Sequence, residues 1–254
     1  GGIWKSLLSL RPDSLLVRST GLLHRMQKLG GAGARVNVGT VNQEDWVTIP
    51  ELVGDFSLNA ANALAAKELL DAGLARVTAS YDLNARSIVQ MADLLQEKSE
   101  QLEVVAHCHM PIFHTEHCVF ARFLTKGNSY IDCGHACTQN NVHLRDELTG
   151  HDNLVLADMG CRNTVFAAQA QTGVYSLKEW NRTGIRQFRV EFVDEDRDNT
   201  QLVLDSYVRV LKGELKPSEV WETLESIHDS NGRAAGVSLG SFRNSKERRA
   251  GEIE

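Results

Sequence analysis

Four cysteines lie close together in one stretch of the sequence. They follow the pattern Cys118-x14-Cys133-x3-Cys137-x23-Cys161, and the fifth cysteine, Cys108, precedes them in a His-Cys-His run. Thiolates are the usual ligands of iron–sulfur clusters and common ligands of zinc. Because a bound metal crosslinks the chain around it, four thiolates can order a segment that lacks a helical or strand period. The pattern therefore predicts a metal centre held by these four cysteines.

The spacing alone leaves two alternatives open. Buried cysteine is a common small apolar residue in reduced proteins, so the thiols can be ordinary core residues. Zinc is the other metal that four thiolates suit, although the spacing differs from the paired C-x2-C knuckles of a zinc ribbon. Cys108 is predicted to be a bystander at the end of a strand.

Several histidines surround the first cysteine and invite comparison with zinc peptidases. The segment His114-Thr-Glu-His117 matches neither the H-E-x-x-H nor the H-x-x-E-H motif. No pair of histidines four residues apart encloses a glutamate base. A mononuclear zinc peptidase is therefore disfavoured.

Short apolar runs that alternate with segments of helical spacing are the elements that must position these residues. Strands are predicted at 14–19, 52–58, 75–81, 102–107 and 187–192, and helices at 21–30, 59–71, 85–98, 176–183, 199–212 and 217–227. Parallel strands need a helical crossover, so the alternation indicates an α/β fold with a parallel sheet. The units number fewer than eight, which predicts a partial TIM-like (β/α) barrel made of its later βα units.

This interpretation divides the chain into four parts. Residues 1–106 are expected to form βα units of the partial barrel, and 107–166 a Cys/His-rich, irregular insertion that binds a cluster. Residues 167–242 are expected to be the C-terminal α/β part of the same domain, with its C-terminal helices, and 243–254 a charged, disordered tail. The missing N-terminal barrel half is expected to belong to a longer chain or to be supplied by a protein partner.

Composition and charge restrict the partners and the compartment. The chain has 254 residues, is 42% hydrophobic and carries a formal net charge of −6. This charge is opposite to the basic footprint of a nucleic-acid-binding surface, so any RNA contact is expected to be local. No apolar run approaches the roughly 20 residues of a membrane-spanning helix. Five cysteines, an odd number, predict a reducing intracellular compartment: cytoplasm, mitochondrial matrix or plastid stroma.

Several blocks of the sequence closely resemble the peptidase U32 (collagenase-like) family. They include the motif Asp132-Cys-Gly-His-Ala-Cys137 and the segments 53–59, 76–84, 109–124, 144–146 and 157–166. The resemblance runs from about residue 12 to about residue 242, and the cysteine blocks are its most specific part. It corresponds to the C-terminal portion of longer family members.

This resemblance implies a TIM-barrel-like domain and a [4Fe–4S] cluster. Positions 118, 133, 137 and 161 match cluster ligands in one relative or another, and the full set of four is an inference. Relatives support oxygen-independent hydroxylation of a tRNA wobble uridine, a ribosomal RNA cytidine or the ubiquinone ring, with prephenate implicated as co-substrate. Two alternatives remain. One is a collagenase-like peptidase, and the other is a non-catalytic subunit of a larger complex in which the cluster only stabilises the structure.

Chemistry in a TIM-like barrel sits at the carboxyl ends of the strands. The polar residues predicted at or just beyond those ends are Asn59, Tyr81, Asp82, His107, His109 and Glu191. The candidates for catalysis are His109, Glu116 and Tyr81, and those for substrate binding are Asn59, Asp82, Arg162 and Glu191. Arg162 follows a predicted ligand and is suited to an anionic group, although a surface salt bridge explains it equally well.

Overall fold

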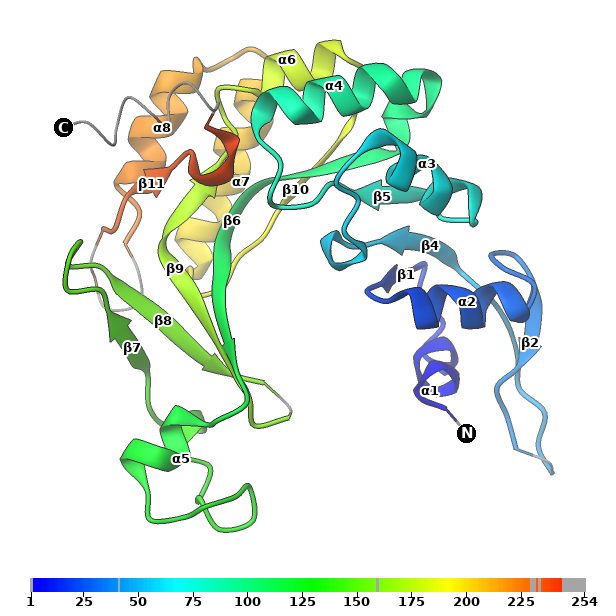
Figure 1. The fold of residues 1–254 in the computed structure, drawn as a ribbon, viewed down its shortest axis with the longest axis horizontal. Helices are drawn as coiled ribbons and strands as arrows, with labels where there is room; N and C mark the ends of the chain where they lie inside the picture. The colour runs from blue at the N-terminus through cyan, green and yellow to red at the C-terminus, as the bar shows by residue number, and fades with distance from the viewer. Residues whose placement is uncertain (1, 41, 159, 229–231, 233, 244–254) are drawn as a thin grey trace. The chain divides into compact units, whose positions relative to one another are not determined.

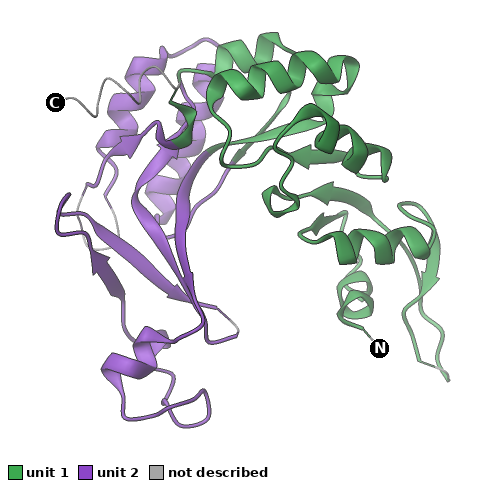
Figure 2. Cartoon of the chain, viewed as in Figure 1, with its two compact units in different colours: residues 1–106, 175–189, 241–254 green, residues 107–174, 190–240 purple. Residues whose placement is uncertain are grey.

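The computed structural model describes residues 2–40, 42–158, 160–228, 232 and 234–243. The chain forms two compact units, shown in Figure 2. Unit 1 comprises residues 1–106, 175–189 and 241–254, and unit 2 comprises residues 107–174 and 190–240. Residues 167–242, which were expected to form one part, are divided between the two units. The predicted charged tail lies outside the described residues, apart from Arg243.

Unit 1 is built on parallel strands with helical crossovers. Strands β1 (Ser14–Val17), β4 (Glu51–Gly54), β5 (Arg76–Thr78) and the start of β6 (Leu102–Thr115) pair in that order, all parallel. Helices α2 (Thr20–Lys28), α3 (Ala63–Asp71) and α4 (Ala85–Leu95) follow the first three strands (Figure 1). The predicted α/β class is confirmed, and these βα units are those of a partial TIM-like barrel.

The starts of these helices follow from their capping residues. Ser19, Asn62 and Asn84 each precede a helix, and each side-chain oxygen accepts a hydrogen bond from a backbone N–H of the first turn. The later helix α6 (Leu177–Arg182) also belongs to unit 1, where Trp180 is fully buried and donates through Nε1 to the carbonyl of Ala85. The core of unit 1 therefore joins segments far apart in the sequence.

Unit 1 has further elements beyond its βα units. Helix α1 (Ile3–Ser9) precedes β1, and β2 (Arg35–Asn37) pairs antiparallel with β3 (Trp46–Thr48). Strand β10 (Gln187–Val190) pairs with β6. Short 3-10 turns lie at η1 (Phe56–Leu58), η2 (Gln96–Gln101) and η4 (Gly240–Phe242).

Unit 2 is a sheet whose main pairs are antiparallel, together with helices; its short pair β11–β9 is parallel. The rest of β6 pairs with β9 (Asn163–Thr172), β9 with β8 (Asp152–Ala157), and β8 with β7 (Val142–Arg145). Strand β11 (Val237–Ser238) pairs with β9, and helix α8 (Pro217–Glu225) contacts both β11 and α7 (Arg197–Leu211). The cysteine segment adds α5 (Val119–Leu124) and the turn η3 (Ala136–Thr138). Within the described ranges, no helix has the length and apolar content needed to cross a membrane.

The prediction that residues 107–166 are irregular is wrong for much of that range. Strand β6 continues to Thr115 instead of ending at His107, and β7, β8 and the first part of β9 fall inside the range. Histidine, cysteine and other polar residues hide the alternation of these strands. Pro111 also argued against a strand, but it is accommodated where the β6–β9 register shifts on either side of it. The added pairs are antiparallel, so the prediction of a parallel sheet holds only for unit 1.

Candidate functional site

The four predicted metal ligands all lie in unit 2, and all are free thiols. Cys118 caps α5 just beyond the end of β6, and Cys161 lies in the connection from β8 to β9. Cys133 and Cys137 come from the segment between α5 and β7, with Cys137 inside η3. Cys137 is exposed, and the other three are half-buried. The four cysteines therefore come from two connections of one sheet: Cys118, Cys133 and Cys137 lie between β6 and β7, and Cys161 lies between β8 and β9.

The four thiols influence one another electrostatically. The pKa of Cys161 is raised, first by partial desolvation and then by the charges of Cys118, Cys133 and Cys137. In the described part of the chain, however, no three His, Cys, Asp or Glu side chains take the arrangement that a single metal ion needs.

Asn163 fixes the position of Cys118. Its side chain is fully buried, and its Oδ1 accepts a hydrogen bond of 2.6 Å from the backbone N–H of Val119. Its Nδ2 lies 3.9 Å from the Cys118 sulfur, towards which it donates. Phe120 and Val165 belong to a small apolar cluster against which Cys118 packs. One buried amide thus connects the start of β9 to the first cysteine.

A tight turn sets the spacing of Cys133 and Cys137. The Asp132 carboxylate accepts hydrogen bonds from the backbone N–H groups of Asn128 and Ser129, and the bonds with Ser129 are the main reason for the lowered pKa of Asp132. Between the cysteines, Gly134 and His135 both have left-handed backbone angles, with φ of 63° and 54°. This reversal gives the two sulfurs their separation.

The turn that carries Cys161 is held by one carboxylate. Asp158 accepts hydrogen bonds from the backbone N–H groups of Gly160 at 2.8 Å and Arg162 at 3.1 Å. It also pairs with the Arg162 guanidinium at 3.1 Å. The structure therefore gives Arg162 the role of a surface salt bridge beside Cys161. Cys108, by contrast, is buried in β6, and burial raises its pKa to about 12, so it remains a neutral thiol.

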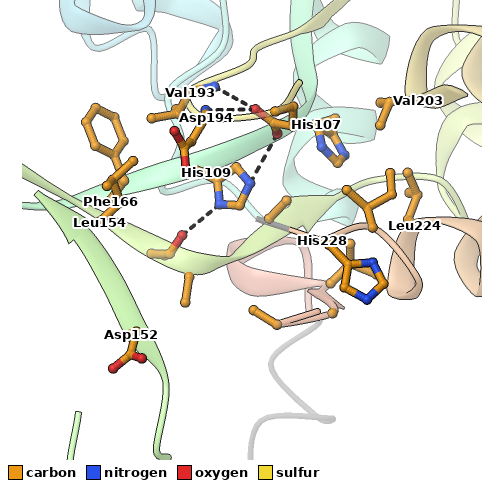
Figure 3. Close-up of a pocket in the computed structure, with 18 of the residues that line it drawn as sticks. His107, His109, Asp152, Leu154, Phe166, Val193, Asp194, Val203, Leu224 and His228 are labelled. Atoms are coloured by element: carbon orange, nitrogen blue, oxygen red, sulfur yellow. Dashed lines mark hydrogen bonds and ion pairs between the residues drawn. The ribbon is translucent and has the colours of Figure 1, made fainter. Parts of the chain in front are cut away.

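A second cluster of titratable groups in unit 2 centres on His109 (Figure 3). His109 Nε2 lies 3.2 Å from Glu195 Oε1, and Nδ1 lies 2.8 Å from the carbonyl of Ala167. Glu195 also accepts from the backbone N–H groups of Val193 and Asp194. Burial disfavours the charged form of both side chains, but the hydrogen bond and the attraction between them outweigh this effect. The pKa of His109 is therefore raised, and that of Glu195 is lowered to about 2. Both ring nitrogens then donate, so the paired His109 is not available as a base.

His107, two residues earlier on β6, has a lowered pKa, in contrast to the raised pKa of His109. Its side chain is 2% exposed, and burial, with a smaller contribution from His109, lowers its pKa to about 4. Its Nδ1 lies 3.4 Å from the hydroxyl of Tyr207, which is 2.5 Å from Thr172 Oγ1. His107 is therefore neutral at physiological pH, next to a charged neighbour.

The other predicted residues are divided between the two units. Asn59, Tyr81 and Asp82 lie in unit 1, beyond the carboxyl ends of β4 and β5. Tyr81 is buried and stacks on Phe56, with ring centroids 4.1 Å apart. In unit 2, Glu116 is exposed shortly before Cys118.

Glu191 is connected to the histidine pair through its backbone. Its backbone N–H donates to the His107 carbonyl at 2.9 Å. The structure thus brings together His107, His109 and the backbone of Glu191, separately from the four cysteines.

Three important residues were not predicted. Glu195 belongs to the acidic run that follows the strand at 187–190. Glu191 was predicted because it lies just beyond a strand end, and the same reasoning applies to Glu195. Asp55, 2% exposed in unit 1, binds Arg18 Nε at 2.9 Å and Arg189 at 2.8 Å, and it directly follows β4. Nothing in the sequence pattern distinguishes Asn163, because its role depends on a contact 44 residues away.

Comparison with known proteins gives one match. The model of a family described as Peptidase family U32 matches residues 16–240. No curated protein and no solved structure matches the chain.

Proposed function

Because this chain belongs to peptidase family U32, we propose that Cys118, Cys133, Cys137 and Cys161 hold a [4Fe–4S] cluster in an enzyme of oxygen-independent hydroxylation. The substrate class that we propose is RNA or a quinone-type ring, with prephenate as co-substrate. Cluster binding is argued from the geometry of the thiols. The reaction is argued from family membership.

The observation that carries the proposal is that two connections of the sheet contribute four free thiols, three from the β6–β7 connection and one from the β8–β9 connection. A tetrahedral zinc ion would draw its sulfurs to about 3.8 Å from one another, because the Zn–S bond is about 2.3 Å. A four-iron cluster keeps its thiolates farther apart, one at each iron. The two metal centres therefore predict different separations of the four sulfurs.

The residues around the thiols suit a cluster of this kind. When bound, a [4Fe–4S] cluster supplies single electrons, often at low potential. The chain provides four thiolates, and Asn163 offers an N–H group towards the Cys118 sulfur. Hydrogen bonds to ligand sulfurs and partial burial both influence the reduction potential. Asp158 and Asp132 hold the turns that present Cys161 and Cys133.

Two alternatives remain in view, a peptidase and a non-catalytic subunit. The family description favours the first, but His109 uses both ring nitrogens and His107 contacts Tyr207, so neither activates a cysteine or serine nucleophile. The small apolar cluster around Phe120 favours the second, because a segment with so little core gains stability from a metal crosslink.

The first test is metal content after anaerobic purification. We expect absorbance near 400 nm and about four iron and four sulfide per chain. Both should be lost in the Cys133→Ala/Cys137→Ala variant and kept in Cys108→Ala, which removes a buried thiol that is not one of the four. Zinc, or no metal, in the wild type would contradict the cluster.

The second test separates the functions of a chain that does carry the cluster. Anaerobic incubation with prephenate and either RNA or a quinone precursor should add one oxygen atom to the substrate, detected by mass spectrometry. Gelatin cleavage that survives loss of the cluster would favour the peptidase. A cluster without either activity, in the presence of the remainder of the barrel, would favour the non-catalytic subunit.

A further inference from the structure

A chain of alternating charges crosses the parallel sheet of unit 1. Each member forms an ion pair with the next, in the order Arg18, Asp55, Arg189, Glu103, Arg76 and Glu51. Glu51 begins β4, and Asp55 directly follows the last residue of this strand, so the chain runs from the amino ends of the strands to their carboxyl ends. Every inner member has two partners of opposite charge, which offset its loss of hydration. The two end members, Arg18 and Glu51, have one ion-pair partner each in the described part of the chain.

Arg18 is the cationic end of this chain, just beyond the carboxyl end of β1. Its Nε donates to Asp55 Oδ2 at 2.9 Å, and its side chain is 64% exposed, whereas that of Asp55 is 3% exposed. Neither Nη group makes a hydrogen bond to a residue that the structure describes. Because a guanidinium carries five N–H donors and Nε supplies one of them, those on both Nη groups remain for another partner.

The loop after β4 fixes the position of this guanidinium. Ser57 Oγ donates to the Arg18 carbonyl at 2.9 Å. The guanidinium carbon lies over the Phe56 ring, 5.5 Å from its centroid, and Phe56 in turn stacks on buried Tyr81. An arginine side chain loses rotamer entropy when a ligand immobilises it. Because Asp55, Ser57 and Phe56 already restrict this side chain, less of that cost remains when a ligand binds.

This arrangement lies where a TIM-like barrel binds its ligands. Arg18 follows β1, Asp55 follows β4 and Tyr81 lies beyond β5, and these three strands are neighbours in the sheet (Figure 1). The carboxyl ends of parallel strands carry the binding and catalytic groups of such barrels. A planar guanidinium with two free Nη groups can bind two oxygens of a carboxylate or phosphate through parallel hydrogen bonds.

We propose that Arg18 anchors a binding site for a small organic anion with a carboxylate or phosphate group. Its Nη groups donate to the anion, and the bound charge balances the cationic end of the chain of charges. Asp55 and Phe56 orient the guanidinium. The site lies within unit 1 and contains none of the four cysteines, so it does not depend on the proposed cluster.

Arg11 provides a matched comparison in the same unit. Its side chain is 68% exposed and pairs with Asp45 at 2.8 Å, but the Asp45 side chain is itself 39% exposed. An ion pair between two exposed side chains is weak and holds neither of them firmly. Arg11 has nearly the same exposure as Arg18 but lacks a buried carboxylate partner, so it should not bind the anion.

The test titrates the full chain, purified anaerobically, with benzoate, phenylphosphate and benzamide. Nitrogen-15 NMR of the Arg18 Nε–H group reports binding at this side chain. At least one of the two anions should shift this resonance saturably, with a Kd of about 1–10 mM, and benzamide should bind at least tenfold more weakly because it carries no charge. The tighter anion identifies carboxylate or phosphate as the group that the site prefers. No saturable shift with either anion, or an equal affinity for benzamide, would overturn the proposal.

Variants then assign the anion to Arg18, with the backbone amide of Ser57 as the NMR reporter. Arg18→Gln should weaken binding of the tighter anion at least tenfold, and Arg18→Lys, which keeps the charge but loses the paired donors, at least threefold. Arg11→Gln should leave the affinity unchanged. Asp55 keeps its ion pair with Arg189 in each variant, so all three should fold. Undiminished binding to Arg18→Gln, or an equal loss in Arg11→Gln, would contradict the assignment.

Discussion

At the scale of single residues, Asn163 has the largest expected effect on the cysteine site. Asn163→Ala removes the 2.6 Å bond to the Val119 N–H and the donor towards the Cys118 sulfur. We expect the free energy of unfolding to fall by about 1–3 kcal/mol, because a buried group loses its partner. Urea denaturation measures this change, and the proposed cluster should also be lost faster in air.

Asn140→Ala is the matched control for Asn163→Ala. Asn140 lies in the cysteine segment, but it is exposed and bonds only the Ala136 carbonyl. Its removal should cost no more than about 0.5 kcal/mol. Equal losses in the two variants would show that Asn163 has no special role.

The His109–Glu195 pair predicts a stability maximum in mildly acidic solution. Glu195 has its pKa lowered from 4.5 to about 2, so its stabilisation is present above pH 4.5 and is lost as the pH falls towards 2. His109 has its pKa raised above 6.5, so its stabilisation is complete below pH 6.5 and is lost as the pH rises through the raised value. Both contributions coexist between pH 4.5 and 6.5.

The double variant His109→Gln/Glu195→Gln checks this prediction. The neighbouring groups His107, Asp194 and Asp152 are left unchanged in this variant. The wild type should exceed the variant in unfolding free energy by about 3 kcal/mol near pH 5.5, with a smaller difference at pH 3 and pH 9. A difference that does not vary with pH would mean that the pair is not ionised.

At the scale of elements, Gly54 limits how closely β4 packs in unit 1. A methyl group there would lie 2.6 Å from a methyl of Leu74 and 3.2 Å from one of Val77, both buried. Gly54→Ala should therefore lower the unfolding free energy by about 1–3 kcal/mol, as overpacking does. Gly21→Ala is the control, because nothing lies within 4 Å of the added methyl in the first turn of α2. A neutral Gly54→Ala would show that the core yields at this point.

The sequence predicted the βα units well because their periods are local. The run at 14–17 buries Leu15 and Val17, and the run at 51–54 buries Leu52 and Val53. Asn62 and Asn84 mark the starts of α3 and α4. The antiparallel strands β7 to β9 escaped prediction because their polar and sulfur-containing residues give no clear alternation. The pairing of β6 with β9 also joins residues far apart in the sequence, and β6 continues past Pro111 through a shift in register.

The candidate site was predictable where residue type alone carries the chemistry. Cysteine is rare, so four in one segment suggested a metal site, although their spacing alone left core thiols and zinc open. His107 and His109 were chosen for their place at the end of a predicted strand. Glu195 and Asn163 act through partners 86 and 44 residues away, which no local pattern specifies. Tyr81 and Asp82 were chosen for their place at strand ends, and the structure gives Tyr81 an aromatic packing partner, Phe56.

At the scale of the whole molecule, the two units differ in how their stability arises. Unit 1 buries apolar side chains along several strands and helices, from Leu52 to Trp180. The cysteine segment of unit 2 has an apolar cluster of only Phe120, Val155 and Val165 among the described residues. Large apolar side chains nearby, such as Phe123 and Ile131, are 78% and 79% exposed. So small a core leaves this segment dependent on other crosslinks.

Hydrogen exchange therefore offers a prediction that depends on this difference. In the Cys133→Ala/Cys137→Ala variant, amides of 116–145 and 152–165 should exchange at least tenfold faster than in the cluster-bearing wild type, because binding free energy there is folding free energy. Amides of β4, β5 and α4 should keep their protection, since their core contains no ligand. Cys108→Ala serves as the control for losing a buried thiol. Unchanged exchange across 116–165 would mean that the segment folds without metal, whereas faster exchange in both units would mean that the cysteines stabilise the whole chain.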